Sequence, residues 1–139
     1  HRCTLKITNG EHAILLPGDI EARQEKQLLM NYMDATDSEK SLLNATVLLA
    51  PHHGSGTSST VDFLRAVDPD VALFQVGYRN RYHHPKAEVW ERYADMGIKT
   101  FRNDEDGAIM LRFKRNGEVN DAVNVSTYRA NHARYWYGK

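Results

Sequence analysis

Three short apolar runs, each followed at once by a turn or a polar loop, most constrain what this chain can fold into. They span residues 12–16, 46–50 and 71–76. The second run is continuous, which is typical of a strand buried on both faces of a sheet, and the third is interpreted as another buried strand. Helical patterns alternate with the strands, so the sequence predicts an α/β (α+β) layered architecture in which helices cover a mixed sheet.

The remaining elements follow from local patterns. Residues 3–8 alternate apolar and polar side chains, and Asn9-Gly10 predicts a tight hairpin to the run at 12–16. Helices are predicted near 21–33, with Ala22, Leu29, Tyr32 and Met33 on the buried face, near 60–67 with Ser59 as its cap, and near 85–96 with Pro85 at its first turn. Further strands are expected at 98–101 and 108–113, with Asp104-Glu105-Asp106 read as part of a hairpin turn.

Composition limits the classes of partner. Lysine plus arginine equal aspartate plus glutamate at 18 each, so no global field draws the chain to nucleic acid or to an anionic membrane. No apolar run approaches the length of a bilayer span. Cys3 is the single cysteine, which excludes an internal disulfide and a cysteine metal cluster. The sequence opens inside a predicted strand, so we expect residues 1–139 to form a single partial domain of a longer protein.

Polar side chains gather in the loops that follow the predicted strands: Gly18-Asp19, the stretch 52–55, and the stretch 80–85. Loops at strand ends are where layered α/β folds usually bind ligands, so we expect these three to meet at one edge of the sheet. Asp19 suits a metal ligand, because its carboxylate follows a flexible glycine at a strand end. It equally suits the N-cap of the helix that follows.

His52 and His53 form the most unusual pair in the sequence. Adjacent side chains of a regular strand point to opposite faces, so both cannot reach one metal from a strand. In a loop, one could ligate a metal while the other hydrogen-bonds in support. Gly54 and Ser55 leave room for a ligand near the backbone. The alternative is that both are ordinary loop histidines.

The loop at 80–85 admits two readings. His84 stands just before Pro85, where it could cap a helix, or it could contact a substrate phosphate together with Asn80. Arg79 and Arg81 interleave with Tyr78 and Tyr82, a mixture that can follow a phosphodiester backbone and stack a base. The same mixture is common on plain protein surfaces.

Four stretches taken together resemble one family. They are Leu15-Leu16-Pro17-Gly18-Asp19-Ile20 with Glu25 downstream, Pro51-His52-His53-Gly54-Ser55, Asn80-Arg81-Tyr82-His83-His84-Pro85, and Asp106-Gly107-Ala108-Ile109. In this order they resemble the C-terminal metallo-β-lactamase-like domain of the ComEC family, which internalises DNA during natural transformation. The resemblance implies an αββα layered sandwich, of which this chain matches about the second half.

The resemblance also implies a function and a site. The parent domain would be a phosphodiesterase or nuclease that uses a divalent metal, Zn or Mn. Asp19 would bridge two metals, His52 would be the second ligand, and His53 would lie beside it as a further catalytic residue. Asn80 and His84 would line the cleft. From the chemistry of their loops, Ser55 and Arg81 are expected as further substrate contacts.

One departure from the family pattern is large. The His-x-Asp-x-Asp-His type of motif that supplies the first metal ligands is absent from these residues. A catalytic zinc site needs about three protein ligands, so we expect this chain alone to bind metal weakly or not at all and to be inactive. Its expected partners are the missing N-terminal half, single-stranded DNA, the membrane through the parent's transmembrane region, and a second copy through uncovered apolar surface.

The parent is then expected in the bacterial inner membrane, with this domain soluble on the periplasmic side. Two other functions stay open from the sequence. One is a non-catalytic module that handles DNA at the uptake channel, motivated by the arginines near 79–81 and the basic, aromatic tail. The other is a hydrolase of the same fold acting on a small ester or thioester, since a fold does not determine a substrate.

Overall fold

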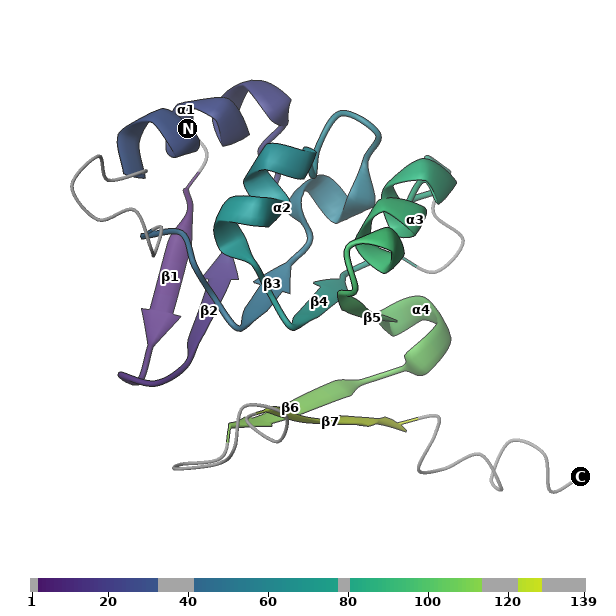
Figure 1. Ribbon diagram of the computed structural model, residues 1–139. Helices are drawn as coiled ribbons and strands as arrows, with labels where there is room; N and C mark the ends of the chain where they lie inside the picture. The colour runs from purple at the N-terminus through teal and green to yellow at the C-terminus, as the bar shows by residue number, and fades with distance from the viewer. Residues whose placement is uncertain (1–2, 33–41, 78–80, 114–122, 129–139) are drawn as a thin grey trace, which may run out of the picture.

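A five-stranded mixed sheet forms the centre of the computed structural model, which describes residues 3–32, 42–77, 81–113 and 123–128 (Figure 1). Its strand order is β1-β2-β3-β4-β5. Strands β2 to β5 run parallel to one another, and β1 pairs antiparallel with β2. The strands are β1 (Leu5–Thr8), β2 (Ala13–Leu16), β3 (Val47–Leu49), β4 (Val71–Phe74) and β5 (Lys99–Arg102). The predicted mixed sheet is confirmed, and the carboxyl ends of β2 to β5 lie at one edge.

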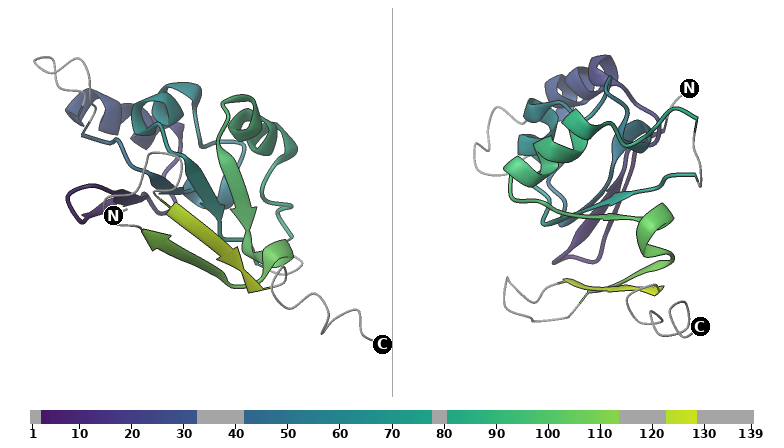
Figure 2. Two further views of the ribbon diagram at one scale, coloured as in Figure 1. Left: turned by 60° about the horizontal axis from the view of Figure 1, so that its bottom comes forward. Right: turned by 90° about the vertical axis from the view of Figure 1, so that its right-hand side faces the viewer.

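Three helices cover one face of this sheet, α1 (Ala22–Tyr32), α2 (Val61–Val67) and α3 (Ala87–Asp95) (Figures 1 and 2). The predicted layered α/β class is therefore confirmed. The main core lies between helices and sheet, where the largest fully buried side chains include Leu15, Leu48, Phe63, Leu64, Phe74, Val89 and Tyr93. Phe74 contacts the rings of Trp90 and Tyr93 at centroid distances of 5.0 and 4.9 Å, which anchors α3 on β4.

The predicted buried face of α1 is only partly correct. Leu29 is half-buried as expected, but Ala22 is exposed and Tyr32 is 44% exposed, while Met33 lies outside the described residues. The fully buried residue of α1 is instead Glu25, whose carboxylate reaches the amino end of α2. Hydrophobic spacing missed it because an acidic side chain counts as surface in such a pattern.

The starts of α2 and α3 also differ from the prediction. Thr60, not Ser59, is the N-cap of α2, and its hydroxyl accepts from the amide of Phe63. Helix α3 begins at Ala87 after an extended Lys86, so neither Pro85 nor His84 occupies the predicted helical position. The amide of Lys86 donates to the carbonyl of Gly54 at 3.0 Å. This bond joins the segment before α3 to the loop after β3 in place of a first helical turn.

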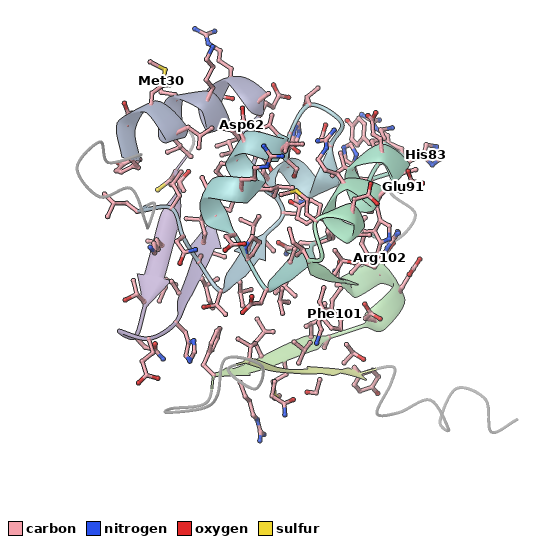
Figure 3. All side chains as sticks on the ribbon, viewed as in Figure 1. Met30, Asp62, His83, Glu91, Phe101 and Arg102 are labelled. Carbon is pink, nitrogen blue, oxygen red and sulfur yellow. The ribbon has the colours of Figure 1, made fainter. Side chains whose placement is uncertain are left out.

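A second, smaller layer lies on the opposite side of the sheet from the helices (Figure 2). It consists of β6 (Ile109–Phe113) and β7 (Val123–Thr127), which pair antiparallel. Phe101 of β5 lies on the side facing this layer (Figure 3) and lines a hollow of about 350 Å³ with Val123 and Val125. Leu5 and Ile7 of β1 are both 51% exposed, so apolar surface does remain uncovered at the sheet edge.

The acidic stretch 104–106 does not form a hairpin turn as predicted. It belongs to a short helix, α4 (Asn103–Asp106), between β5 and β6. The guanidinium of Arg102 donates two hydrogen bonds of 2.7 Å to Asp104, and its amide donates to Asp106 at 2.9 Å. These bonds fold the acidic residues back onto β5. Within the described ranges, no helix combines the length and the apolar character that crossing a bilayer requires.

Candidate functional site

Loops from neighbouring parallel strands bring acidic and imidazole side chains together at the carboxyl edge of the sheet. Asp19 follows β2, and His53 follows β3. The Nε2 atom of His53 lies 3.2 Å from Oδ1 of Asp19. Both side chains are about half exposed, so an ion pair between them adds little to stability, and a ligand from solvent can reach them.

The loop after β3 has an unusual backbone. Residues Pro51–Gly54 form a single tight turn, η1, in which His52 and His53 both adopt left-handed conformations with φ of 48° and 56°. Such conformations cost about 1–3 kcal/mol for a residue with a side chain, and they cluster at functional sites. Gly54 also has a positive φ, and a Cβ there would come within 2.5 Å of the Cβ of Pro85. The turn thus depends on a glycine and holds two histidines in strained positions.

The hydrogen bond of His53 determines which of its nitrogens carries a proton. Nδ1 lies 2.7 Å from the carbonyl oxygen of Gln75, which can only accept, so Nδ1 donates. Nε2 is therefore the atom that faces the Asp19 carboxylate. A neutral imidazole would turn a lone pair toward that carboxylate, an unfavourable contact that a proton or a cation held between the two groups would relieve.

His52 has different neighbours from His53. Its amide donates to the carbonyl of Gly18 at 2.9 Å, which joins this loop to the Asp19 loop. Its Nδ1 atom lies 3.4 Å from Oε1 of Glu21, yet this buried nitrogen has no partner in hydrogen-bonding geometry in the described structure. The contact is within ion-pair distance but poorly directed, so we treat the two groups as neighbours rather than as a hydrogen-bonded pair.

The sequence analysis did not identify Glu21 as a site residue. The sequence predicted Glu21 only as the first residue of a helix, whereas its carboxylate lies against His52 and accepts a hydrogen bond from the hydroxyl of Thr57 at 3.1 Å. One signal in the sequence could have identified Glu21 as a site residue: it is a second carboxylate, two positions after Asp19 and still before the first turn of α1. Because α1 begins at Ala22, Asp19 does not occupy the N-cap position that was its alternative role.

The structure distributes the two histidines differently from the pairing that the family resemblance implied. Asp19 contacts His53, and His52 lies with Glu21. The rings of the two histidines are 6.5 Å apart between centroids, so both remain in the same cluster. The ligand role assigned to His52 stays a prediction, and the geometry adds His53 as a histidine within 3.2 Å of Asp19.

The described part of the predicted loop at 80–85 also lies near His52. The ring of His84 is 6.0 Å from that of His52 and stacks nearly parallel on Tyr82 at 5.8 Å. Burial, followed by the charge of Lys86, lowers the pKa of His84 below its usual value. Arg81 is exposed and donates to the Tyr82 hydroxyl at 2.8 Å, while Asn80 lies outside the described residues.

Ser55 is buried, and its hydroxyl is engaged inside the loop with Thr57 at 3.0 Å. Its predicted substrate contact stays a prediction. Beyond it, a buried polar network holds the rest of the loop: the Glu25 carboxylate accepts from the amides of Ser59 and Thr60 at 2.6 and 2.7 Å and from the Thr60 hydroxyl at 2.8 Å. Burial nevertheless raises the pKa of Glu25, and these hydrogen bonds with the charge of Arg92 oppose the shift.

Helix α3 closes this network from the other side. Arg92 donates to the carbonyl of Ser59 at 2.6 Å, and the hydroxyls of Ser59 and Tyr93 are 2.8 Å apart. Burial is also the main reason why the pKa of Tyr93 is raised far above its usual value. The loop that carries the two histidines is thus fixed at its far end by side chains from α1 and α3.

A metal ion would find two, rather than three, close protein ligands here. Across the described ranges, no group of three histidine, cysteine, aspartate or glutamate side chains is near enough to hold an ion. The donor set that is present, one imidazole and one carboxylate, suits zinc or manganese. The buried Nδ1 of His52 adds a third polar group beside this pair.

Comparison with known proteins relates the chain to segments of much longer proteins. It is 34% identical over 137 residues to Competence protein ComA of Neisseria gonorrhoeae, covering 99% of this chain and 18% of that protein. It is 31% identical over 137 residues to Uncharacterized protein YcaI of Escherichia coli (strain K12), covering 99% and 17%. It is 30% identical over 110 residues to ComE operon protein 3 of Bacillus subtilis (strain 168), covering 79% and 13%.

The chain therefore spans less than one fifth of the length of these relatives, one of which is named for competence and another for the ComE operon. No protein-family model matches the sequence. The part of the family resemblance that concerns competence proteins is supported by these relatives, and the metallo-β-lactamase likeness is not addressed by them.

Proposed function

We propose that this chain carries part of a divalent-metal site in a phosphodiesterase domain of a DNA-uptake protein, with Asp19 and His53 as metal ligands. The observation that carries the proposal is the arrangement of His53. Its Nδ1 donates to the backbone carbonyl of Gln75, and its Nε2 faces Asp19 at 3.2 Å. Metal-binding histidines commonly donate their second nitrogen in this way, which fixes the ring and its tautomer.

The distance between the two groups fits one shared ion. Two ligand atoms that are each about 2.0–2.1 Å from a tetrahedral zinc are about 3.3–3.4 Å apart. The observed 3.2 Å between Nε2 and Oδ1 is within about 0.2 Å of that value. An ion between them would also replace the unfavourable contact of a lone pair with a carboxylate.

The other residues of the cluster would act around such an ion. Glu21 lies 3.4 Å from the buried Nδ1 of His52 and can orient this ring or take up its proton. Arg81 is exposed beside Tyr82, where its charge can attract a phosphate group. When bound, the metal supplies Lewis acidity toward a phosphate oxygen and toward water. The ligands still needed would come from outside the residues described.

The substrate and the setting are proposed from the relatives. Competence protein ComA and ComE operon protein 3 are named for competence and its operon. We therefore propose DNA as the substrate of the complete protein, with cleavage of a phosphodiester as the reaction. The parent would lie in the inner membrane, with this domain outside the cytoplasm and the upstream half of the domain as its first partner.

A manganese titration followed by NMR tests the ligand assignment on this chain. Mn²⁺ is expected to broaden amide resonances around Asp19 and His53 first. Asp19→Asn and His53→Ala should each weaken this effect at least tenfold in ion concentration, since each removes one of two ligands. His83→Asn is the matched control, because His83 is exposed and asparagine tolerates its left-handed backbone.

Two results would contradict the assignment. One is broadening that persists unchanged in the Asp19→Asn and His53→Ala double variant. The other is broadening centred on the acidic helix α4 rather than on the loop after β3. In the complete protein, nuclease activity with Mn or Zn should be lost on Asp19→Ala, and activity that survives this change would argue against a catalytic role for the site.

A further inference from the structure

A cavity of about 390 Å³ opens directly beside the Asp19–His53 pair. It lies between the ends of β4 and β5 and the loop before α3, and its lining residues are His53, Gln75, Val76, Gly77, Tyr82, His84 and Asn103. His53 both lines the cavity and belongs to the Asp19–His53 pair, so a ligand in the cavity would lie against this pair. The volume falls within the range of small-molecule sites.

The chemistry of the lining favours a flat, uncharged group. None of these seven residues is an aspartate, a glutamate, a lysine or an arginine. The pKa of His84 is lowered, mainly by burial, so its ring is neutral near pH 7. Gly77 adds no side chain, and a Cβ at this position would meet no atom within 4 Å. An anion such as phosphate would find little here to bind, whereas an aromatic heterocycle would find apolar and aromatic walls.

Two aromatic rings provide a platform for stacking. Tyr82 and His84 lie nearly parallel, with an interplanar angle of 18° and centroids 5.8 Å apart. Tyr82 is 58% exposed, and the guanidinium of Arg81 lies over its ring at 4.9 Å from the centroid, so a base that stacks there takes the place of this guanidinium. Lys86 donates to the backbone carbonyl of Tyr82 at 2.8 Å, which anchors the loop, and the exposed Arg81 donates to the Tyr82 hydroxyl at 2.8 Å.

Hydrogen-bonding groups also face this space. Oδ1 of Asn103 accepts from the amide of Val76 at 2.6 Å, which leaves its amide group as the donor end of a side chain that lines the cavity. Asparagine donors can pair with the carbonyl groups on the edge of a base. Arg81 does not line the cavity, but its guanidinium lies 4.9 Å from the centroid of the Tyr82 ring, where its charge suits the phosphate of the same nucleotide.

We propose that the cavity beside His53, walled by Tyr82 and His84, is a nucleobase subsite that holds the base next to the phosphate at the Asp19–His53 pair. This inference rests on the proposed function, because the phosphate position is that of the proposed metal site. Stacking on an aromatic ring accepts every base, so the subsite would bind single strands with little sequence preference. It also requires an unpaired base, because a base inside a duplex cannot enter a pocket.

Binding of an oligothymidylate of about six residues to the chain, without metal, tests the subsite by NMR. Shifts are expected at Val76, Gly77, Tyr82 and Asn103. Tyr82→Leu should weaken binding about tenfold or more, because it removes one stacking ring. Tyr82→Phe is the matched control, since it keeps the ring and loses only the hydroxyl, and its affinity should stay within about twofold.

An oligomer of the same length made of abasic residues separates base from backbone recognition. The Tyr82→Leu change should leave its binding unchanged, because the backbone does not enter the cavity. Equal weakening of both oligomers by Tyr82→Leu, equal binding of both by the unaltered chain, or no detectable binding of the oligothymidylate would overturn the subsite. Since no metal is present, these results are independent of the manganese titration, which tests the assignment of Asp19 and His53 as metal ligands.

Discussion

Replacing Glu25 by glutamine is expected to lower the free energy of unfolding by about 2–3 kcal/mol. Glu25 is fully buried, and its two oxygens accept three hydrogen bonds from Ser59 and Thr60. Glutamine can keep an oxygen toward Thr60, where two of the donors lie. Its amide group must then face the amide of Ser59, a donor that lies 2.6 Å from the carboxylate.

The magnitude follows from what that substitution removes. A hydrogen bond to a charged group contributes about 1.5–3 kcal/mol, and a buried donor left without a partner costs about 1–3 kcal/mol. The loss of a buried charge offsets part of this sum, because the carboxylate no longer has to be desolvated. Glu25→Ala removes the acceptor for all three donors and is expected to cost more, about 3–5 kcal/mol.

Stability should also depend on pH through this residue. Burial raises the pKa of Glu25 in the folded chain above its ordinary value, so the folded state holds the proton more tightly than the unfolded state. The contribution of protonated Glu25 to the free energy of unfolding is therefore complete below the pKa of the unfolded chain, and it is lost as the pH rises through the higher pKa of the folded chain. A protonated carboxyl can turn its single hydrogen away from Ser59, which the two hydrogens of a glutamine amide cannot both do.

Urea denaturation followed by circular dichroism between pH 4 and pH 7 measures both effects. Glu91→Gln is the control, because Glu91 is exposed on α3 (Figure 3) and its change should stay within about 0.5 kcal/mol. The Glu25→Gln variant should lack the component of the pH dependence described above. If it unfolds within 0.5 kcal/mol of the unaltered chain and with the same pH dependence, the network does not stabilise the loop as argued.

Two further substitutions test the loop from other sides. Gly54→Ala should lower the free energy of unfolding by about 2–5 kcal/mol, since the backbone has a φ of 84° and the new Cβ would lie 2.5 Å from the Cβ of Pro85. Gly77→Ala is the control and should be nearly neutral, because a Cβ there meets no atom within 4 Å; equal unfolding midpoints of the two variants would contradict this. Tyr93→Phe should cost about 1 kcal/mol by removing the hydroxyl that bonds to Ser59, and an unchanged free energy of unfolding would show that this bond contributes nothing.

The sheet was predictable because its information is local. Asn9-Gly10 between two apolar stretches predicted the β1–β2 hairpin, and Asn9 does turn the chain there by accepting from the amides of residues 11 and 12. The runs that became β3 and β4 were apolar on both faces because helices cover one face and the β6–β7 layer lies on the other. Periodicity and turn residues report such environments directly.

The features that were missed depend on partners far apart in the sequence. Glu25 bonds to residues 34 and 35 positions away, and nothing near it in the sequence marks an acidic residue as core. Glu21 meets a histidine that follows a different strand. Which of His52 and His53 contacts Asp19 depends on two successive residues in the left-handed conformation, and no local pattern of these residue types predicts that conformation.

The strain in that turn bears on how a metal would bind. Backbone hydrogen bonds hold it: the amide of Ser55 donates to His52 within the turn, while the amide of His52 donates to Gly18 and that of Lys86 to Gly54. These bonds, together with that of the His53 ring to Gln75, position the backbone and the ring from which His53 approaches Asp19 at 3.2 Å. On the proposed function, binding would then cost little ordering of these side chains, and affinity would be limited by the number of ligands rather than by their placement. Supplying the remaining ligands should accordingly raise affinity without moving the loop after β3.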